Sequence, residues 1–171
     1  MRRPERVAAA ALLALAATAA AAQTPCTLVF GQGRNPPAAG APDWDGLNAR
    51  FSAAVVGALD AAGHRVVAMT ASTAQIDPRA TGLALLQRAD AAGCGTLAET
   101  SVFADERQEL VLRLRVYPLL PQLGDGGIVG LRIGAPLFVT RRELALATLP
   151  RLRPELLAAQ MAAEYLQHDR R

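Results

Sequence analysis

Arginines and a few acids are the side chains of this chain that could do chemistry, because lysine is absent and histidine is rare. All 18 basic residues are arginine, and the two histidines are His64 and His168. A chain without lysine has no Schiff-base nucleophile, no P-loop lysine and no Ser-x-x-Lys pair. Neither histidine lies at metal-ligand spacing from cysteines or carboxylates. We therefore predict no catalytic residue, no metal site and no cofactor, and we expect a protein that is not an enzyme.

The arginines are grouped where they could hold an anion. Arg113 and Arg115 alternate with apolar residues in the stretch 109–117, so they share the exposed face of a predicted strand. Arg132, on a later predicted strand, could join them, with Glu99 nearby. Guanidinium groups bind carboxylate or phosphate through paired hydrogen bonds. The alternative is ordinary cross-strand ion pairing on a solvated face.

Asp43, Trp44 and Asp45 form a second candidate site at the start of a predicted helix. The indole ring could stack on a sugar while the two acids and Arg34 bind its polar groups. This reading predicts a small-ligand or glycan-binding protein. In the structural alternative Asp43 caps the helix, Asp45 complements the helix dipole and Trp44 anchors the core.

The loop of residues 31–42 is a third candidate surface, and it carries Arg34 and Asn35. It leaves the carboxyl end of a predicted strand, where α/β folds commonly bind ligands. Gly31-Gln32-Gly33 resembles the start of a phosphate-binding loop, but Asn35-Pro36-Pro37 separates it from the next helix. We therefore predict no dinucleotide site and expect either a ligand or partner surface or a solvated connection.

The elements that position these residues alternate between strands and helices. Apolar runs and alternating patterns predict strands at 26–30, 65–69, 94–104, 109–117 and 128–133. Apolar residues spaced three and four apart predict helices from about 44 to 62, 78 to 92 and 154 to 167. Residues 118–127 are rich in Pro and Gly and predict a loop. Residues 136–140 could extend the last strand or form another.

The order β-α-β-α-β-β-β-α predicts an α/β protein with a mixed sheet and helices packed on it. Two right-handed crossovers place the first strand between the second and third, and the later hairpins add antiparallel strands. Cys26 and Cys94 begin the first and third strands, so they should lie within disulfide range. Two buried free thiols are the alternative.

The first 22 residues are typical of a secretory signal peptide. Three arginines precede an apolar run from 7 to 22, which ends on three alanines. The run has 16 residues, whereas a membrane-spanning helix needs about 20. We predict cleavage after Ala22 and a periplasmic or secreted location. Lipidation of Cys26 is an alternative, although the preceding Gln23-Thr24-Pro25 suits a lipoprotein signal poorly.

Residues 23–171 are then predicted to form a single exported domain of 149 residues. The net charge of the whole chain is +3, but the leader holds three arginines and one glutamate. The remaining 15 basic and 14 acidic residues nearly balance, so we expect no nucleic-acid partner. We also expect no integral membrane span after signal cleavage.

The layout of residues 27–48 and 91–116, including Ala92-Gly93-Cys94-Gly95, resembles a known small periplasmic α/β domain. Curli-secretion lipoproteins, penicillin-binding-protein activator lipoproteins and the N-terminal domain of the Tol-system β-propeller protein share it. The chain departs from this pattern in lacking the lipid-carrying cysteine, by our interpretation, and in its longer loop at 118–127. The resemblance implies an accessory domain that binds another cell-envelope protein. The alternatives are a small-ligand or glycan binder and, less favoured, a hydrolase.

Overall fold

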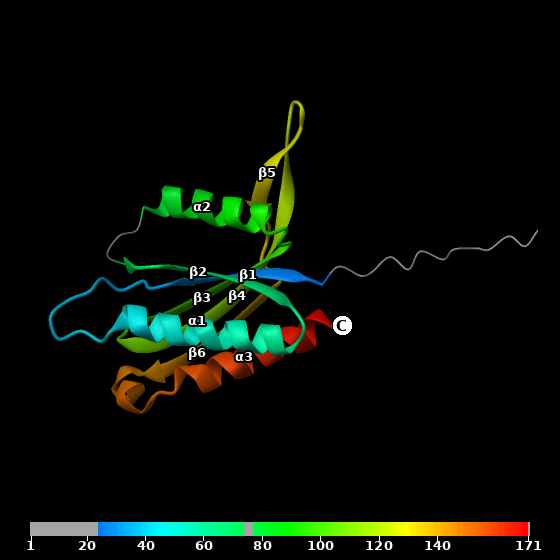
Figure 1. The fold of residues 1–171 in the computed structure, drawn as a ribbon. Coiled ribbons are helices and arrows are strands. Elements are labelled where there is room, and N and C mark those ends of the chain that lie inside the picture. Colours follow the sequence, from blue (N-terminus) through cyan, green and yellow to red (C-terminus); the bar gives the residue numbers. More distant parts are fainter. Residues whose placement is uncertain (1–23, 74–76, 171) are drawn as a thin grey trace, which may run out of the picture.

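The computed structural model describes residues 24–73 and 77–170, so the predicted leader lies outside the described residues. The chain is a mixed α/β fold with helices on both faces of a six-stranded sheet (Figure 1). The elements are, in order, β1 (Cys26–Gln32), α1 (Trp44–Ala61), β2 (Arg65–Ala71), α2 (Pro78–Ala91), β3 (Thr96–Ala104), β4 (Glu109–Gly124), β5 (Gly127–Ile133), β6 (Phe138–Ala145), the 3-10 helix η2 (Leu146–Arg151) and α3 (Pro154–Asp169). No helix in these described ranges is long and apolar enough to cross a membrane.

The sheet has the strand order β2-β1-β3-β4-β5, and β6 also pairs with β4. β1 runs parallel to both β2 and β3, whereas β4 is antiparallel to β3, β5 and β6. The predicted place of the first strand between the second and third is confirmed. The starts of β1 and β3 are therefore neighbours, and Cys26 and Cys94 form the predicted disulfide with a Cα–Cα distance of 4.4 Å.

The strand β4 extends well beyond its predicted end. The prediction of a loop at 118–127 is wrong, because β4 continues to Gly124 and forms a hairpin with β5. Pro121 is tolerated because proline lacks an N–H and suits an unpaired strand edge. The N–H of Leu119 points to Gly95 beside β3, and by alternation Pro121 faces the same side, beyond the start of β3 at Thr96. Residues 138–145 form a separate strand rather than an extension of β5.

The two faces of the sheet are packed differently. On one face α1 and α3 cover a core that includes Phe51, Leu112 and Met161, all fully buried. On the other face α2 covers a smaller core around Phe30, Leu85 and the disulfide. In Figure 1, α1 and α3 lie below the sheet and α2 lies above it, beside the β4–β5 hairpin. The contacts of α2 with the sheet are mainly to β2 and β5, and the side chains of Glu99, Arg113 and Arg115 remain partly exposed.

Two asparagines extend the sheet past the end of β1. The backbone N–H of Val102 donates to Asn48 Oδ1 at 2.7 Å, and Asn48 Nδ2 donates back to the Val102 carbonyl at 2.9 Å. Two residues further along β3, Ala104 makes the same paired contact with Asn35 at 2.8 and 3.0 Å. β1 pairs with β3 only as far as Thr100. The two amides thus satisfy backbone groups that would otherwise lack a strand partner.

Gly31 allows α1 to approach β1 closely. An added Cβ at Gly31 would lie 2.2 Å from Ser52 Oγ, which is hydrogen bonded to Thr100 Oγ1 at 2.6 Å in the buried layer between sheet and helix. We expect Gly31→Ala to lower the free energy of unfolding by about 1–3 kcal/mol, as overpacking does. Urea denaturation measures this change.

The matched control for this variant is Gly57→Ala, on the exposed side of α1. A Cβ at Gly57 meets nothing within 4 Å, so alanine should raise stability by about 0.5–1 kcal/mol through its better helix propensity. Equal effects of the two substitutions would contradict the close approach of α1 at Gly31.

Candidate anion-binding site

The predicted arginine cluster lines a pocket of about 290 Å³ on the reachable part of the second sheet face. We call it the arginine pocket, and its lining residues are Gln32, Arg34, Glu99, Ser101, Arg113 and Arg115. Strand register brings them together, since Glu99 lies opposite Arg115 and Ser101 lies opposite Arg113. Side chains of directly opposed residues share one face of a sheet. The pocket is therefore built by β1, β3 and β4 together.

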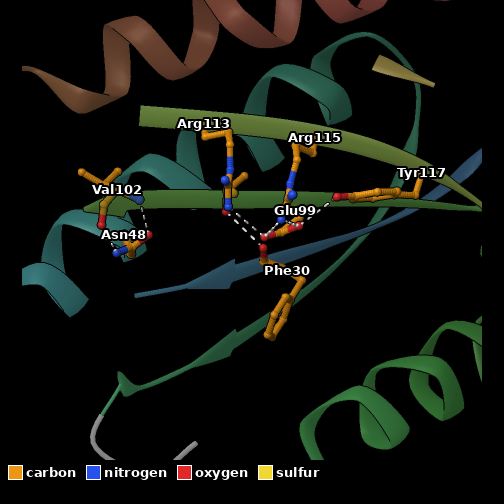
Figure 2. A network of polar contacts seen from close by, with 8 residues as sticks. Phe30, Asn48, Glu99, Val102, Arg113, Arg115 and Tyr117 are labelled. Atoms are coloured by element: carbon orange, nitrogen blue, oxygen red, sulfur yellow. Dashed lines mark hydrogen bonds and ion pairs between the residues drawn. The ribbon is translucent and has the colours of Figure 1, made fainter. Parts of the chain in front are cut away.

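Among residues 24–73 and 77–170, Glu99 is the only carboxylate that lines the arginine pocket, and three side chains of β4 converge on it (Figure 2). Arg115 donates to both carboxylate oxygens at 2.6 Å, and Tyr117 donates its hydroxyl at 3.3 Å. A guanidinium nitrogen of Arg113 lies 3.5 Å from Glu99 Oε1. The side chains of Glu99 and Arg113 are only 19% and 17% exposed, so these contacts are partly shielded from solvent.

Arg34 closes the pocket from the loop that follows β1. Its guanidinium lies 4.7 Å from the ring centroid of Phe103, and that of Arg113 lies 5.5 Å from the same ring. The neighbouring Asn35 is tied to the backbone of Ala104, which fixes the loop next to β3. The loop prediction thus named residues that reach the site, but the side chain of Asn35 is used in holding the loop.

The arginine pocket carries more positive than negative charge. Three guanidinium groups face one carboxylate. Burial lowers the pKa of Arg113, the charge of Arg115 lowers it further, and Glu99 compensates only in part. Burial also opposes the charge of Arg115, but its hydrogen bond and proximity to Glu99 outweigh burial and raise its pKa. Glu99 therefore favours the charged form of Arg115 more strongly than that of Arg113.

The buried hydroxyl of Ser101 also lines this pocket. Ser101 is 1% exposed, and its Oγ has no hydrogen-bond partner within residues 24–73 and 77–170. The Nε atoms of Arg113 and Arg115 are likewise buried and unpartnered in that part of the chain. Buried polar groups are normally hydrogen bonded, and a hydroxyl can donate to an anion. The site thus combines a hydroxyl donor with two guanidinium groups, which suits a carboxylate or phosphate.

Arg132 does not join the arginine pocket. It is exposed on β5 and pairs with Leu120, five residues beyond Arg115 along β4. The expectation that it shares the face of Arg113 is wrong, because the extension of β4 past the predicted loop pairs Arg132 with Leu120, whose side chain alternates to the face opposite that of Arg113. The same extension places Arg132 beyond β3 altogether.

The acid–aromatic trio is used for structure. Trp44 is 6% exposed and belongs to the core beneath α1, so its ring is not available to stack on a sugar. Asp43 caps α1 by accepting from the N–H of Gly46 at 2.9 Å. Asp45 accepts from Ser72 Oγ at 2.6 Å and so ties α1 to the segment after β2. The structural alternative for Asp43 and Trp44 therefore holds, and the three residues do not line the arginine pocket.

Sequence reasoning missed Ser101, which lines the arginine pocket, and Phe103, whose ring lies against Arg34 and Arg113. A signal was present, because Glu99, Ser101 and Phe103 alternate along β3 as Arg113 and Arg115 alternate along β4. Cross-strand register was needed to see that the two sets face each other.

The histidines lie outside the arginine pocket. His64 Nδ1 is 3.4 Å from Thr27 Oγ1, and the His168 ring packs against Phe138 with centroids 5.6 Å apart. Across the described ranges, no three His, Cys, Asp or Glu side chains are grouped as metal ligands.

Comparison with known proteins assigns neither a family nor a function to this chain. The sequence matches no protein-family profile, and no well-characterised protein is significantly similar to it. The functional interpretation therefore rests on the chain's own residues.

Proposed function

We propose that this protein is an exported, non-enzymatic accessory domain that binds an acidic segment of another cell-envelope protein in the arginine pocket. The observation that carries the proposal is the set of three guanidinium groups and one buried hydroxyl around a single internal carboxylate. The disulfide supports an extracytoplasmic location, since such bonds persist in oxidising compartments. The resemblance to accessory periplasmic domains points the same way.

The pocket favours binding over catalysis. Arginine stays protonated near neutral pH and does not exchange protons as a general acid or base must. Its planar fork instead holds carboxylates by paired, charge-assisted hydrogen bonds. An incoming carboxylate would contact Arg34 and Arg113 and accept from the Ser101 hydroxyl, while Arg115 stays with Glu99. Partial burial of Arg113 strengthens its contact because solvent screens it less, whereas Arg34 is exposed.

The double variant Arg34→Gln/Arg113→Gln tests this function. Each lost charge-assisted hydrogen bond contributes about 1.5–3 kcal/mol, so binding of the partner should weaken by about 100-fold or more. The partner is first captured by crosslinking in envelope extract and identified by mass spectrometry. Its dissociation constant is then measured by titration with the purified wild-type and variant proteins.

Arg88→Gln is the matched control, because Arg88 is exposed on α2 outside the pocket. It makes the same change of charge and should alter affinity by about twofold at most. Raising the salt from about 0.05 to 0.5 M should weaken wild-type binding through screening. A reproducible partner that binds the double variant as tightly as the wild type would overturn the proposal.

A further inference from the structure

A second pocket adjoins the arginine pocket and has the opposite character. This apolar bay has a volume of about 330 Å³ and lies between the sheet and the N-terminal half of α2. Its lining residues are Phe30, Gln32, Pro78, Thr81, Gly82, Leu85, Leu97, Glu99, Tyr117 and Ile133. Gln32 and Glu99 line both pockets, so the two are neighbours. In Figure 2, Phe30 points from the strand toward α2, away from the arginines.

The bay is open because α2 presents a glycine to it. A Cβ added at Gly82 would meet nothing within 4 Å. On the other side, Ile133 of β5 is 44% exposed, although it is a large apolar side chain. Phe30 and Leu85 also line the bay, and both residues are buried. An apolar side chain entering here would be removed from water on several sides.

The spacing of the two pockets matches that of an extended peptide. Phe30, Glu99 and Arg115 lie in one cross-strand row, and Ser101 and Arg113 lie in the next. Adjacent rows are two residues apart along each strand, or about 6.6 Å. Side chains two residues apart in an extended peptide point the same way and have the same separation.

We propose that the acidic segment bound by the arginine pocket is extended and places an apolar side chain, two residues from its acidic one, in the apolar bay. This inference rests on the proposed function and specifies the chemistry of the partner. The acidic side chain is the first anchor, because its charge complements Arg34 and Arg113. The apolar side chain is the second anchor, because the apolar bay accepts it. Gln32 lines both pockets, so its side-chain amide can hydrogen bond a peptide group between the two anchors. A fatty acid would also offer a carboxylate and an apolar chain, but it has no such peptide group.

Synthetic peptides with blocked ends test the spacing. The probe is acetyl-Gly-Ser-Glu-Gly-Leu-Ser-Gly-amide, together with the peptide in which Glu and Leu exchange places, because chain direction is open. Binding is measured by NMR titration of the labelled protein. In whichever of the two peptides binds more tightly, replacing Leu by Gly should weaken binding by about 10-fold or more, as expected for a buried leucine. A peptide with Glu and Leu adjacent should bind as weakly as the peptide with Gly in place of Leu, because adjacent side chains of an extended chain point to opposite sides.

The variant Gly82→Leu fills the bay while leaving the arginines in place. Replacing a helical glycine favours the helix, so the fold should be kept. The Leu-containing peptide should then bind no better than its Gly version. Gly57→Leu, on the exposed side of α1, makes the same exchange away from the site and should leave binding unchanged.

The outcomes separate this inference from the proposed function. If Gly82→Leu leaves peptide binding unchanged while Arg34→Gln/Arg113→Gln abolishes it, the apolar anchor is wrong and the acidic anchor stands. If the arginine variant binds every peptide and the captured partner like the wild type, both fail. If decanoate binds more tightly than the peptides and Gly82→Leu excludes it, the occupant is an alkyl carboxylate and the peptide proposal is overturned.

Discussion

Replacing both cysteines by alanine is expected to lower the free energy of unfolding by about 4 kcal/mol, because the disulfide closes a long loop. Cys26 and Cys94 are separated by 68 residues, and the bond joins the first residue of β1 to the segment just before β3. In the chain-entropy account such a crosslink restricts the unfolded chain more strongly as the loop lengthens. Urea denaturation under non-reducing conditions measures the loss.

Reduction of the wild-type protein is the companion measurement. Reductant should destabilise the wild type and leave the Cys26→Ala/Cys94→Ala variant unchanged, since that variant has no bond to break. The two side chains are only 5% and 3% exposed, so any difference between the reduced wild type and the variant reports packing of the sulfur atoms. A double variant as stable as the oxidised wild type would contradict the expected crosslink effect.

Replacing Asn48 by alanine is expected to cost about 3 kcal/mol of stability, because it leaves buried backbone groups unpaired. Asn48 is 4% exposed, and its amide serves the N–H and the carbonyl of Val102 as a strand neighbour would. It also donates to the Trp44 carbonyl at 2.9 Å. Alanine removes these partners from backbone groups that are buried in the protein.

Hydrogen exchange locates the effect of this substitution. The amide of Val102 should lose protection in Asn48→Ala more than amides of β3 that pair with β4. Asn48→Asp is the matched variant, because it keeps the size and the acceptor but replaces the donor to the Val102 carbonyl. It should also destabilise the protein. A loss below about 1 kcal/mol in Asn48→Ala would show that the amide pairing contributes little.

The same amide pairing connects the fold with the candidate site. β1 ends at Gln32, so the β3 edge beyond Thr100 must find other partners. Asn35 supplies one of them, and in doing so it holds the loop that presents Arg34 to Phe103. The position of the third guanidinium of the arginine pocket thus follows from where β1 stops.

The sequence by itself determined the local elements and much of the topology. The spacing of apolar residues located α1, α2 and α3, and Asp43 and Asp77 cap the first two as expected. The crossover rule placed β1 between β2 and β3, which led to the disulfide. Alternation also placed Arg113 and Arg115 on one face, because it assigns side chains to a face without knowledge of distant contacts. Glu99 was expected nearby, and the strand register decided that it lies opposite Arg115.

Only the tertiary structure decided how β4 continues, where Arg132 lies and what the two asparagines do. Pro121 could stay in a strand because its edge happens to be unpaired, which depends on where β3 begins. Asn48 and Asn35 meet residues 54 and 69 positions away, at an edge created by the end of β1. Periodicity in a short window reports which side of an element is buried. It does not report where a neighbouring strand stops, and that boundary is what placed Arg34 at the arginine pocket.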